Sequence, residues 1–357
     1  MLVVQVVYWG LVFRPITQLS SNKKATLIAD YPAISVVICA RNEAQNISER
    51  LEKILKQDYP VFEVVVVNDA SDDTTATVLQ RYQEKYSHLR VIAIQKKKSL
   101  GKKAALTEGI KAAQYEWLLL TDADCVPSSD RWIKTMQNSV QPTTQMVLGY
   151  GPYESEPTMV NRWVQYETIY VAIQYFSMAL WGVPYMGVGR NLMYRRELFE
   201  AVGGFEQHQE SLSGDDDLFV NAVANGSNTV ICTAASSFMY SPAPSSWRSL
   251  YTQKKRHYSS SSYYKWYFQL VLGLLSLSHA FYYLFLWIII GTNSWNFIIL
   301  GFVFLRWLLV YNVWLKFSQR VQTVAWLPYL WVLDILLPFY YLIMANTTYN
   351  SQNKKWK

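Results

Sequence analysis

Two groups of aspartates have the residue types and the spacing for metal and proton chemistry. In SGDDDLF, which begins at Ser213, three consecutive aspartates run directly into two large apolar side chains. Carboxylates this close raise one another's pKa, so the cluster faces water, binds a cation, or keeps one carboxyl ready to accept a proton. Upstream, Asp122 and Asp124 stand one residue apart, a spacing at which both can bind one hard divalent ion, Mg²⁺ or Mn²⁺.

The segments around these aspartates predict an α/β fold. Short β-rich runs alternate with stretches whose apolar residues repeat at helical spacing. The first run, ISVVIC, is continuously apolar, as in a strand buried on both faces of a sheet. The expected strands are 34–39, 63–68, 91–94 and 117–120, with helices after residue 46 and at 73–86 and 101–113. This order predicts a mostly parallel, Rossmann-like sheet.

Polar residues follow three of the expected strands. The first is followed by ARNE (40–43), the second by polar residues at 68–71 and the fourth by TDAD (121–124). Aspartate, asparagine and serine also cap helices and make turns, which is the structural alternative for each of them. Because ligands bind at the carboxyl ends of parallel strands, three such ends at one sheet edge predict a binding site there.

The later part of the chain has the composition of membrane helices. Charged residues are nearly absent from 263–344, and the apolar segments 268–290, 297–315 and 326–344 approach the roughly 20 residues that a helix needs to cross a bilayer. Aromatic residues at their ends favour membrane spans over the alternative, a buried soluble bundle.

Two apolar segments depart from a simple span. Pro328, Asp334 and Pro338 predict that the third segment is kinked or re-entrant. The N-terminal run from Leu2 to Phe13 is too short to cross, so we interpret it as an interfacial anchor or as the tail of a longer span.

Basic residues set the expected orientation. The run at 254–256 precedes the first span and Lys316 and Arg320 follow the second, whereas the loop at 291–296 carries no charge. The positive-inside rule then places the large polar domain in the cytoplasm, on a multi-pass protein of the cell inner membrane.

Net charge and cysteine usage narrow the classes of partner. The net charge of +7 favours an anionic lipid surface or a phosphate-bearing ligand, and no nucleic-acid-binding motif accompanies it. Cys39, Cys125 and Cys232 lack metal-site spacing, so we expect reduced, packed thiols.

Seven motifs, taken in order, resemble the landmarks of glycosyltransferase family 2, whose members are inverting transferases of the GT-A fold that use nucleotide sugars. They are SVVICARNE (35–43), VVVNDASDD (65–73), LGKKAALTEGI (100–110), TDADC (121–125), GRNLMYRRELFEAVGGF (189–205), SGDDDLF (213–219) and QKKRH (253–257). The resemblance covers roughly 31–258, with membrane segments afterwards as in the membrane-bound members of the family.

The resemblance implies roles on the donor side of the site. Ala40, Glu43 and Asp69 match positions that line the nucleoside pocket. Asp122 and Asp124 match the metal-binding pair, with Asp122 also near the nucleotide. Lys102 matches a lysine near the diphosphate, and its alternative is a solvated lysine at the start of a helix.

The resemblance also implies a catalytic base. Aligned with the family's acidic motif, Asp216 removes the proton from the acceptor hydroxyl, and Asp215 takes that role if the register shifts by one residue. The alternative is a solvated acidic helix N-terminus favoured by the helix dipole.

The final landmark departs from the family pattern. Gln253 and Arg256 are present, but His257 stands where many membrane-bound members have tryptophan, which puts stacking on an acceptor sugar in doubt. Arg256 can still bind phosphate oxygens. We place the acceptor region at His257, Trp181 and Arg190.

The expected organisation has five parts. They are an apolar anchor with a basic linker (1–30), the GT-A domain (31–240), an interfacial segment with QKKRH (241–266), about three transmembrane helices (267–345) and a basic tail (346–357). The aromatic segments 163–181 and 247–266 predict interfacial helices; the alternatives are a core helix for the first and a solvated linker for the second.

These observations predict a membrane-bound glycosyltransferase of the hexosyltransferase type. It would move a sugar from a nucleotide-diphosphate sugar, with UDP favoured by the resemblance alone, to a lipid-linked or membrane-proximal hydroxyl in cell-envelope glycan or glycolipid synthesis. One alternative is a processive polysaccharide synthase that assembles with partner subunits. Another, from a different class, is a catalytically silent nucleotide-binding scaffold.

Overall fold

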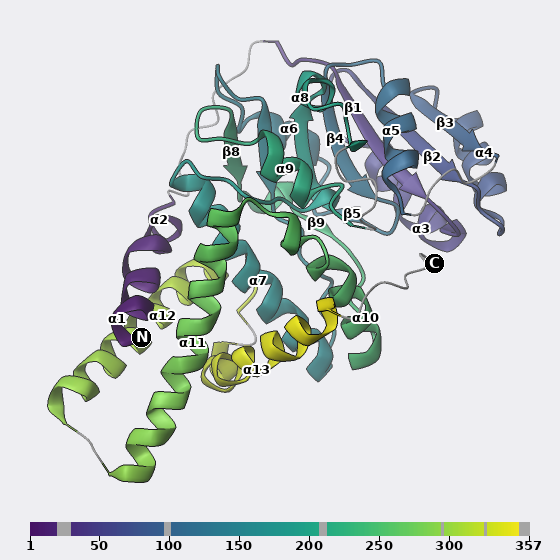
Figure 1. Cartoon of the computed structure of the whole chain (residues 1–357). Helices are drawn as coiled ribbons and strands as arrows, with labels where there is room; N and C mark the ends of the chain where they lie inside the picture. Colours follow the sequence, from purple (N-terminus) through teal and green to yellow (C-terminus); the bar gives the residue numbers. More distant parts are fainter. Residues whose placement is uncertain (20–29, 96–100, 207–212, 294–295, 325–326, 350–357) are drawn as a thin grey trace.

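A computed structural model describes residues 1–19, 30–95, 101–206, 213–293, 296–324 and 327–349. The basic linker expected before residue 30 and the tail at 350–357 lie mainly outside the described residues. The polar part of the chain is an α/β domain, and apolar helices extend from one side of it (Figure 1).

The main sheet has seven strands in the order β3-β2-β1-β4-β7-β6-β8. Their bounds are β1 Ile34–Ala40, β2 Phe62–Asp69, β3 Leu89–Ile94, β4 Trp117–Asp122, β6 Met146–Gly149, β7 Leu192–Arg195 and β8 Thr229–Cys232. The first four pair in parallel, β7 is antiparallel to both its neighbours, and β6 pairs with β8 in parallel. The four expected strands and the mostly parallel sheet are confirmed. A small second sheet joins β5 (Val126–Pro127) to β9 (Met239–Tyr240).

Helices cover both faces of the main sheet. They are α3 Ala44–Leu55, α4 Thr75–Lys85, α5 Lys103–Ala112, α6 Trp132–Gln137, α7 Met159–Leu180, α8 Arg196–Ala201 and α9 Asp217–Val223. A further helix, α10 Trp247–Tyr258, packs against α7 and not against the sheet. Alternate residues of each strand point to opposite faces, so Val36 joins the core beneath α3 while Val37 joins the core beneath α5. Ile47, Leu51, Ile54 and Leu55 form the buried face of α3, as their spacing predicts.

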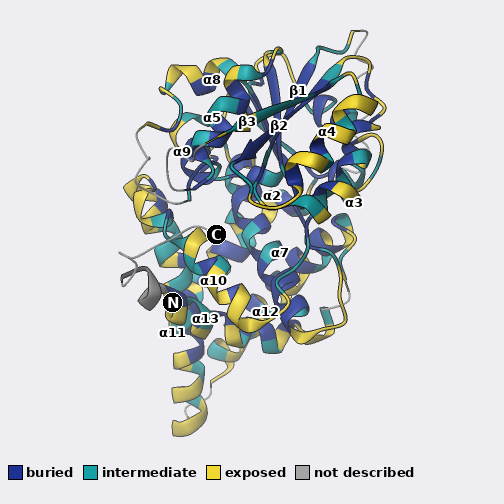
Figure 2. Ribbon diagram, turned by 90° about the vertical axis from the view of Figure 1, so that its right-hand side faces the viewer, coloured by how far each residue is buried: buried dark blue, intermediate teal, exposed yellow. Residues whose placement is uncertain are grey.

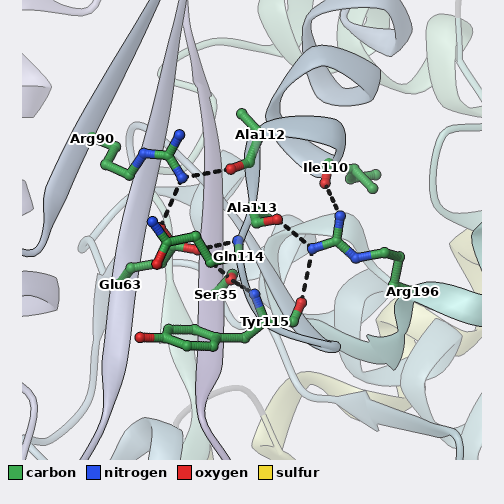
Figure 3. Close-up of polar contacts among 9 residues, drawn as sticks. All are labelled: Ser35, Glu63, Arg90, Ile110, Ala112, Ala113, Gln114, Tyr115 and Arg196. Atoms are coloured by element: carbon green, nitrogen blue, oxygen red, sulfur yellow. Dashed lines mark hydrogen bonds and ion pairs between the residues drawn. The ribbon is translucent and has the colours of Figure 1, made fainter.

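A partly buried polar network surrounds the C-terminal end of α5 (Figure 3). Arg90 and Arg196 donate to the carbonyls that α5 and the following loop leave unpaired, among them Ala112 at 2.6 Å. Glu63 accepts from the hydroxyl of Ser35 at 2.6 Å. Positive side chains at a helix C-terminus satisfy its free carbonyls and oppose its dipole. The network therefore holds α5, and with it the start of α5 at the other edge of the sheet.

The apolar helices form a hairpin and a third helix that turns back. The hairpin consists of α11 (Trp266–Thr292) and α12 (Phe297–Arg320), and α13 (Leu330–Tyr349) contains Pro338. Three segments, 266–292, 297–320 and 327–344, are long and apolar enough to cross a membrane. The end of the hairpin farthest from the sheet is largely exposed (Figure 2), and its exposed residues include Trp287 and Phe297. Apolar surface of this kind is typical of contact with lipid.

The third apolar helix does not run alongside the hairpin. From its start beside α11, α13 returns toward α10 and packs against it (Figure 1). That the segment is kinked or re-entrant within a membrane stays a prediction. The N-terminal helices α1 (Leu2–Val7) and α2 (Arg14–Thr17), joined by a π-helical turn at Tyr8–Val12, lie along α12 (Figure 1).

The helix α7 joins the α/β domain to the apolar helices. It is buried at sixteen of its 22 positions. Its Tyr166 ring stacks on Trp314 of α12, with centroids 4.7 Å apart and planes at 6°. The prediction of an interfacial helix at 163–181 is therefore wrong and its core alternative is correct, because aromatic rings of other elements, among them Trp9 and Trp314, pack against the helix.

Five buried side chains form what we call the membrane-side polar cluster: Gln5, His279, Tyr283, Arg306 and Asp334. Asp334 accepts from the Nη1 of Arg306 at 2.9 Å and from the hydroxyl of Tyr283, and His279 lies 3.3 Å away. Gln5 accepts from the Nε of Arg306 at 3.2 Å. The cluster therefore ties α1, α11, α12 and α13 together.

Candidate active site

A cleft of ≈ 580 Å³ opens at the carboxyl ends of β1, β2 and β4. Its walls come from all three loops predicted from the sequence, together with α7, the turn before β7, the start of α9, and α10. The sequence-predicted residues that line it are Ala40, Glu43, Asp69, Lys102, Asp122, Asp124, Arg190, Asp215, Asp216, Gln253, Arg256 and His257. The prediction that three strand ends meet at one edge of the sheet is thus confirmed.

The loops after β1 and β2 are tied to each other. Asn42 has φ 56° and Ala70 has φ 51°, the left-handed region that non-glycine residues seldom adopt. The Asn42 N–H donates to the Ser71 hydroxyl at 3.0 Å, and the Asp72 N–H donates to the Asn42 side chain at 2.8 Å. This pairing holds Asp69, which is buried at the end of β2, beside the loop after β1.

Asp122 and Asp124 lie at the end of β4 with oxygens close enough for one cation. One ligand atom from each of Asp122, Asp124 and Cys125 lies within 4.8 Å of the others. Burial and the neighbouring Asp122 raise the pKa of Asp124, and burial raises the pKa of Cys125 well above its usual range. Cys125 is therefore a thiol, which donates to Asp124 at 3.4 Å, and the two carboxylates remain as the hard oxygen ligands that Mg²⁺ or Mn²⁺ prefers.

Lys102, directly before α5, joins the two acidic groups. Its Nζ lies 2.8 Å from Asp122 and 2.9 Å from Asp215, two residues that are 93 positions apart in the sequence. Burial lowers the pKa of Lys102, but the two carboxylates outweigh burial and hold it well above its usual value. The lysine is therefore charged. It also keeps the pKa of Asp122 below its usual range despite burial.

The three consecutive aspartates have three different surroundings. Gly214 has φ +97°, and a Cβ there would lie 2.4 Å from Leu218, so this turn requires glycine. The turn points Asp215 at Lys102. Asp217 is buried on the other side, where it accepts from the hydroxyls of Ser260 and Tyr264, the latter at 2.7 Å. It holds the chain after α10 against α9.

Asp216, the central aspartate, faces the cleft. Its carboxylate accepts from the Gly189 N–H at 2.7 Å and from the Asp217 N–H at 2.8 Å. Gly189 permits this close approach, since a Cβ there would lie 3.1 Å from the same oxygen. Burial, together with the adjacent Asp215 and Asp217, raises the pKa of Asp216 to about 7. A carboxyl with this pKa is suited to accept a proton near neutral pH.

The helix α10 presents the QKKRH motif to the cleft. The hydroxyl of Tyr153 donates to Gln253 at 3.4 Å, while Arg256 and His257 are exposed within the hollow. Shielding from bulk water and the nearby Lys254 and Arg256 lower the pKa of His257 well below its usual value. Its ring is therefore neutral near pH 7.

The residues predicted to form the acceptor region do not all lie in the cleft. Arg190 lines the cleft, where its guanidinium donates to the Gly151 carbonyl at 2.9 Å and lies 4.3 Å from the centre of the Tyr153 ring. Trp181 is not in the cleft: it lies beyond the last turn of α7, its side chain is 58% exposed, and its indole N–H donates to Val12. Trp181 therefore does not lie with Arg190 and His257, because α7 carries that residue past the cleft to the apolar helices.

Several cleft residues were not predicted. Glu167 is fully buried on α7 and pairs with Lys254 of α10, and it also accepts from the Tyr258 hydroxyl at 3.0 Å. Tyr153 and Tyr175 line the same end of the cleft. The available signal was that Glu167 is the one acidic residue of a helix rich in apolar and aromatic residues, since a buried acid requires a partner.

The sheet and the arrangement of acidic groups indicate the class of protein to which this domain belongs. A mostly parallel α/β sheet with paired carboxylates at one strand end, and a second acidic group opposite them, is a GT-A domain. Residues 35–203 match the family model described as "Glycosyl transferase family 2". The chain therefore carries a glycosyltransferase family 2 domain, and three long apolar helices follow that domain.

Two proteins of similar sequence are also glycosyltransferases by their names. The chain is 32% identical over 97 residues to a poly-beta-1,6-N-acetyl-D-glucosamine synthase of Staphylococcus epidermidis, covering 27% of this chain and 23% of that protein. It is 24% identical over 243 residues to the probable glycosyltransferase YdaM of Bacillus subtilis, covering 66% of this chain and 56% of that protein. The chain thus spans less than two thirds of either relative.

A solved structure shares the fold. The mannosyltransferase PcManGT of Pyrobaculum calidifontis, in complex with GDP-Man and Mn²⁺, superposes with a TM-score of 0.55. The sequence identity is 22%, and the likeness covers 72% of this chain and 69% of the mannosyltransferase.

Proposed function

We propose that this protein is a membrane-bound inverting glycosyltransferase that moves a sugar from a nucleotide-diphosphate sugar to the hydroxyl of a lipid-linked or membrane-proximal acceptor. The supporting observation is the bridge that Lys102 makes between Asp122 and Asp215. It brings the carboxylate pair suited to a metal and the group suited to proton transfer into one cleft.

The donor occupies the part of the cleft formed by the loops after β1, β2 and β4. Asp69 and Glu43 would line the pocket for the nucleoside, and Asp122 and Asp124 would hold Mg²⁺ or Mn²⁺. When bound, that cation neutralises charge on the leaving diphosphate. Lys102 and Arg256 add positive charge beside the same phosphates.

The acceptor enters from the side of α7 and α10. Asp216 accepts the proton of the acceptor hydroxyl as its oxygen attacks the anomeric carbon and the bond from that carbon to the diphosphate breaks. Attack on the face opposite the leaving group inverts the configuration. The two backbone N–H donors that hold Asp216 orient its carboxylate for this step.

The membrane helices support an acceptor that is presented by a lipid. The helix α10, which lines the cleft, is followed within a few residues by α11. The basic run at 254–256 in α10, before the first span, and Lys316 and Arg320 at the end of the second favour a catalytic domain on the cytoplasmic face of the cell inner membrane. The same arrangement fits synthesis of a cell-envelope glycan or glycolipid.

Two other functions are alternatives to this proposal. A processive synthase is favoured by the synthase relative, but that likeness is confined to 97 residues, and His257 replaces the tryptophan expected to stack on a growing sugar chain. A silent nucleotide-binding scaffold has no chemical need for the pKa of about 7 at Asp216.

The test supplies purified protein, in detergent with Mg²⁺ or Mn²⁺, with a panel of UDP-sugars and GDP-sugars and with membrane lipid extracts. We expect slow release of the nucleoside diphosphate from one donor and, by mass spectrometry, one added sugar per lipid. A ladder of products would establish the processive alternative. Tight nucleotide binding without turnover on any extract would establish the scaffold.

A further inference from the structure

A second hollow, of ≈ 540 Å³, lies where the N-terminal helices, the end of α7 and the start of α11 meet. We call it the apolar groove. It is lined by Val3, Val4, Val7, Tyr8, Leu11, Val12, Met178, Trp181, Val183, Val271 and Leu274. Its size falls within the range of about 300–1,000 Å³ that is typical of ligand sites.

Two of the lining side chains, Tyr8 and Trp181, have a polar atom, and each of these atoms already makes a hydrogen bond within the protein. The Tyr8 hydroxyl donates to the carbonyl of Val271 at 2.7 Å, and the Trp181 indole donates to the carbonyl of Val12 at 3.0 Å. The remaining lining side chains are hydrocarbon or, at Met178, thioether. A polar ligand would lose its hydrogen bonds to water here without replacement, so the lining selects hydrocarbon.

The apolar groove and the cleft share two walls. Along α7, Thr168, Val171 and Tyr175 line the cleft, and Met178 lines the groove. Their spacing of three and four residues places them on one face of the helix. The chain after α7 runs back in the opposite order, with Val183 at the groove and Met186 at the cleft.

The groove lies at the end of the hairpin nearest the α/β domain. Its residues Val271 and Leu274 belong to the first turns of α11, just after the exposed aromatic residue Trp266. Leu11, Val7 and Leu274 are each more than 40% exposed, so the groove is open on its outer side. Aromatic residues of this kind mark the boundary between headgroups and hydrocarbon.

We propose that the apolar groove binds one hydrocarbon chain of the lipid whose hydroxyl enters the cleft. The inference rests on the proposed function and adds the class of acceptor: a lipid held by its chain along α7. The groove differs from ordinary lipid-facing surface because three separate elements enclose it and one of them, α7, also forms a wall of the cleft.

The first experiment maps where a chain binds. The protein is placed in phosphatidylethanolamine–phosphatidylglycerol vesicles containing a phosphatidylglycerol with a photoreactive diazirine in mid-chain, and adducts are located by peptide mass spectrometry. We expect adducts on 3–12, 178–183 and 271–274 at least about tenfold above those on the exposed face of α12. Even labelling of all lipid-facing helices would overturn the proposal.

The second experiment fills the groove. Val7→Trp and Leu11→Trp should each lower groove adducts at least about fivefold and slow transfer to membrane lipid, with release of nucleoside diphosphate from the donor unchanged. The matched control is Leu277→Trp, on the exposed side of α11 outside the groove. Unchanged labelling and transfer in both groove variants would overturn the proposal.

Two further results separate the possible failures. An inter-protomer disulfide formed by Val7→Cys, with no lipid adducts, would assign the groove to a second copy of the chain and overturn the proposal. If wild type labels in the groove but releases no nucleoside diphosphate from any donor, the proposed function fails while lipid binding stands.

Discussion

The open cleft and the buried membrane-side polar cluster both contain carboxylates, but they balance charge in opposite ways. In the cluster, one carboxylate, Asp334, accepts from Arg306 and Tyr283, and the His279 ring lies 3.3 Å away. In the cleft, one cation, Lys102, is shared by two carboxylates, and Asp216 accepts from neutral backbone N–H groups.

This difference separates a structural cluster from a functional one. A buried carboxylate and its donors connect the helices that supply them, because removal of one partner leaves the other buried and unpaired. Carboxylates in excess of their cations cost stability in the free protein, and the positive charge of a ligand offsets that cost on binding. Charge balance therefore identifies the cleft as the part of the described chain suited to bind a cation.

The largest expected effect comes from the proton acceptor. Asp216→Asn keeps the shape of the side chain but removes its basicity, so transfer should fall by about 10²- to 10⁴-fold. Binding of the nucleotide, measured by calorimetry, should be retained. Asp215→Asn is the matched variant: if it abolishes transfer and Asp216→Asn does not, Asp215 is the base.

Breaking the balanced cluster should affect stability. Asp334→Ala leaves the guanidinium of Arg306 buried without its carboxylate, at a cost of about 3–5 kcal/mol in the free energy of unfolding. The double variant Asp334→Leu with Arg306→Leu removes both charges and should recover most of the loss in thermal melting. A single variant that melts at the wild-type temperature would contradict the structural role.

Removing the shared cation should make the cleft more negative. Lys102→Met should tighten binding of Mn²⁺ in the absence of nucleotide at least about tenfold. This change is smaller than the roughly 4 kcal/mol with which two unit charges 4 Å apart interact near a protein surface. Transfer should fall because the diphosphate loses a cation. The control is Lys111→Met, an exposed lysine on the same helix. Unchanged Mn²⁺ affinity would show that Lys102 does not neutralise the site.

The rate should depend on pH through Asp216. Its folded pKa of about 7 exceeds the usual 3.8, so kcat/KM should rise with pH and level off above about pH 7. Since the folded state holds this proton more tightly, the contribution to stability is full below pH 3.8 and is lost as pH rises through 7. A profile of kcat/KM that is flat from pH 5.5 to 8 would exclude Asp216 as the group that titrates.

The smallest effect is expected at the thiol beside the metal-binding pair. Cys125→Ala should leave both transfer and Mn²⁺ affinity within about threefold of wild type, because a protonated, buried thiol is a poor ligand for a hard cation. A loss of Mn²⁺ affinity larger than tenfold would make Cys125 a metal ligand.

The sequence by itself determined the local elements and the chemistry at their ends. Continuous apolar runs of β-branched residues dictate buried strands, and the spacing of Ile47, Leu51 and Ile54 dictates the inner face of α3. Since parallel strands place their carboxyl ends at one edge of the sheet, the sequence was sufficient to predict that Asp69 and Asp122 lie at the same site. The three apolar segments were equally evident, because length and hydropathy are local properties.

Tertiary structure alone decided which distant residues meet. The contact of Lys102 with Asp215 depends on how α5 and α9 pack, and composition does not encode that arrangement. The same holds for Trp181, whose aromatic character suits a sugar site, although the length of α7 carries it to the apolar groove. Likewise, three adjacent aspartates are alike in sequence, and the turn at Gly214 gives each a different partner.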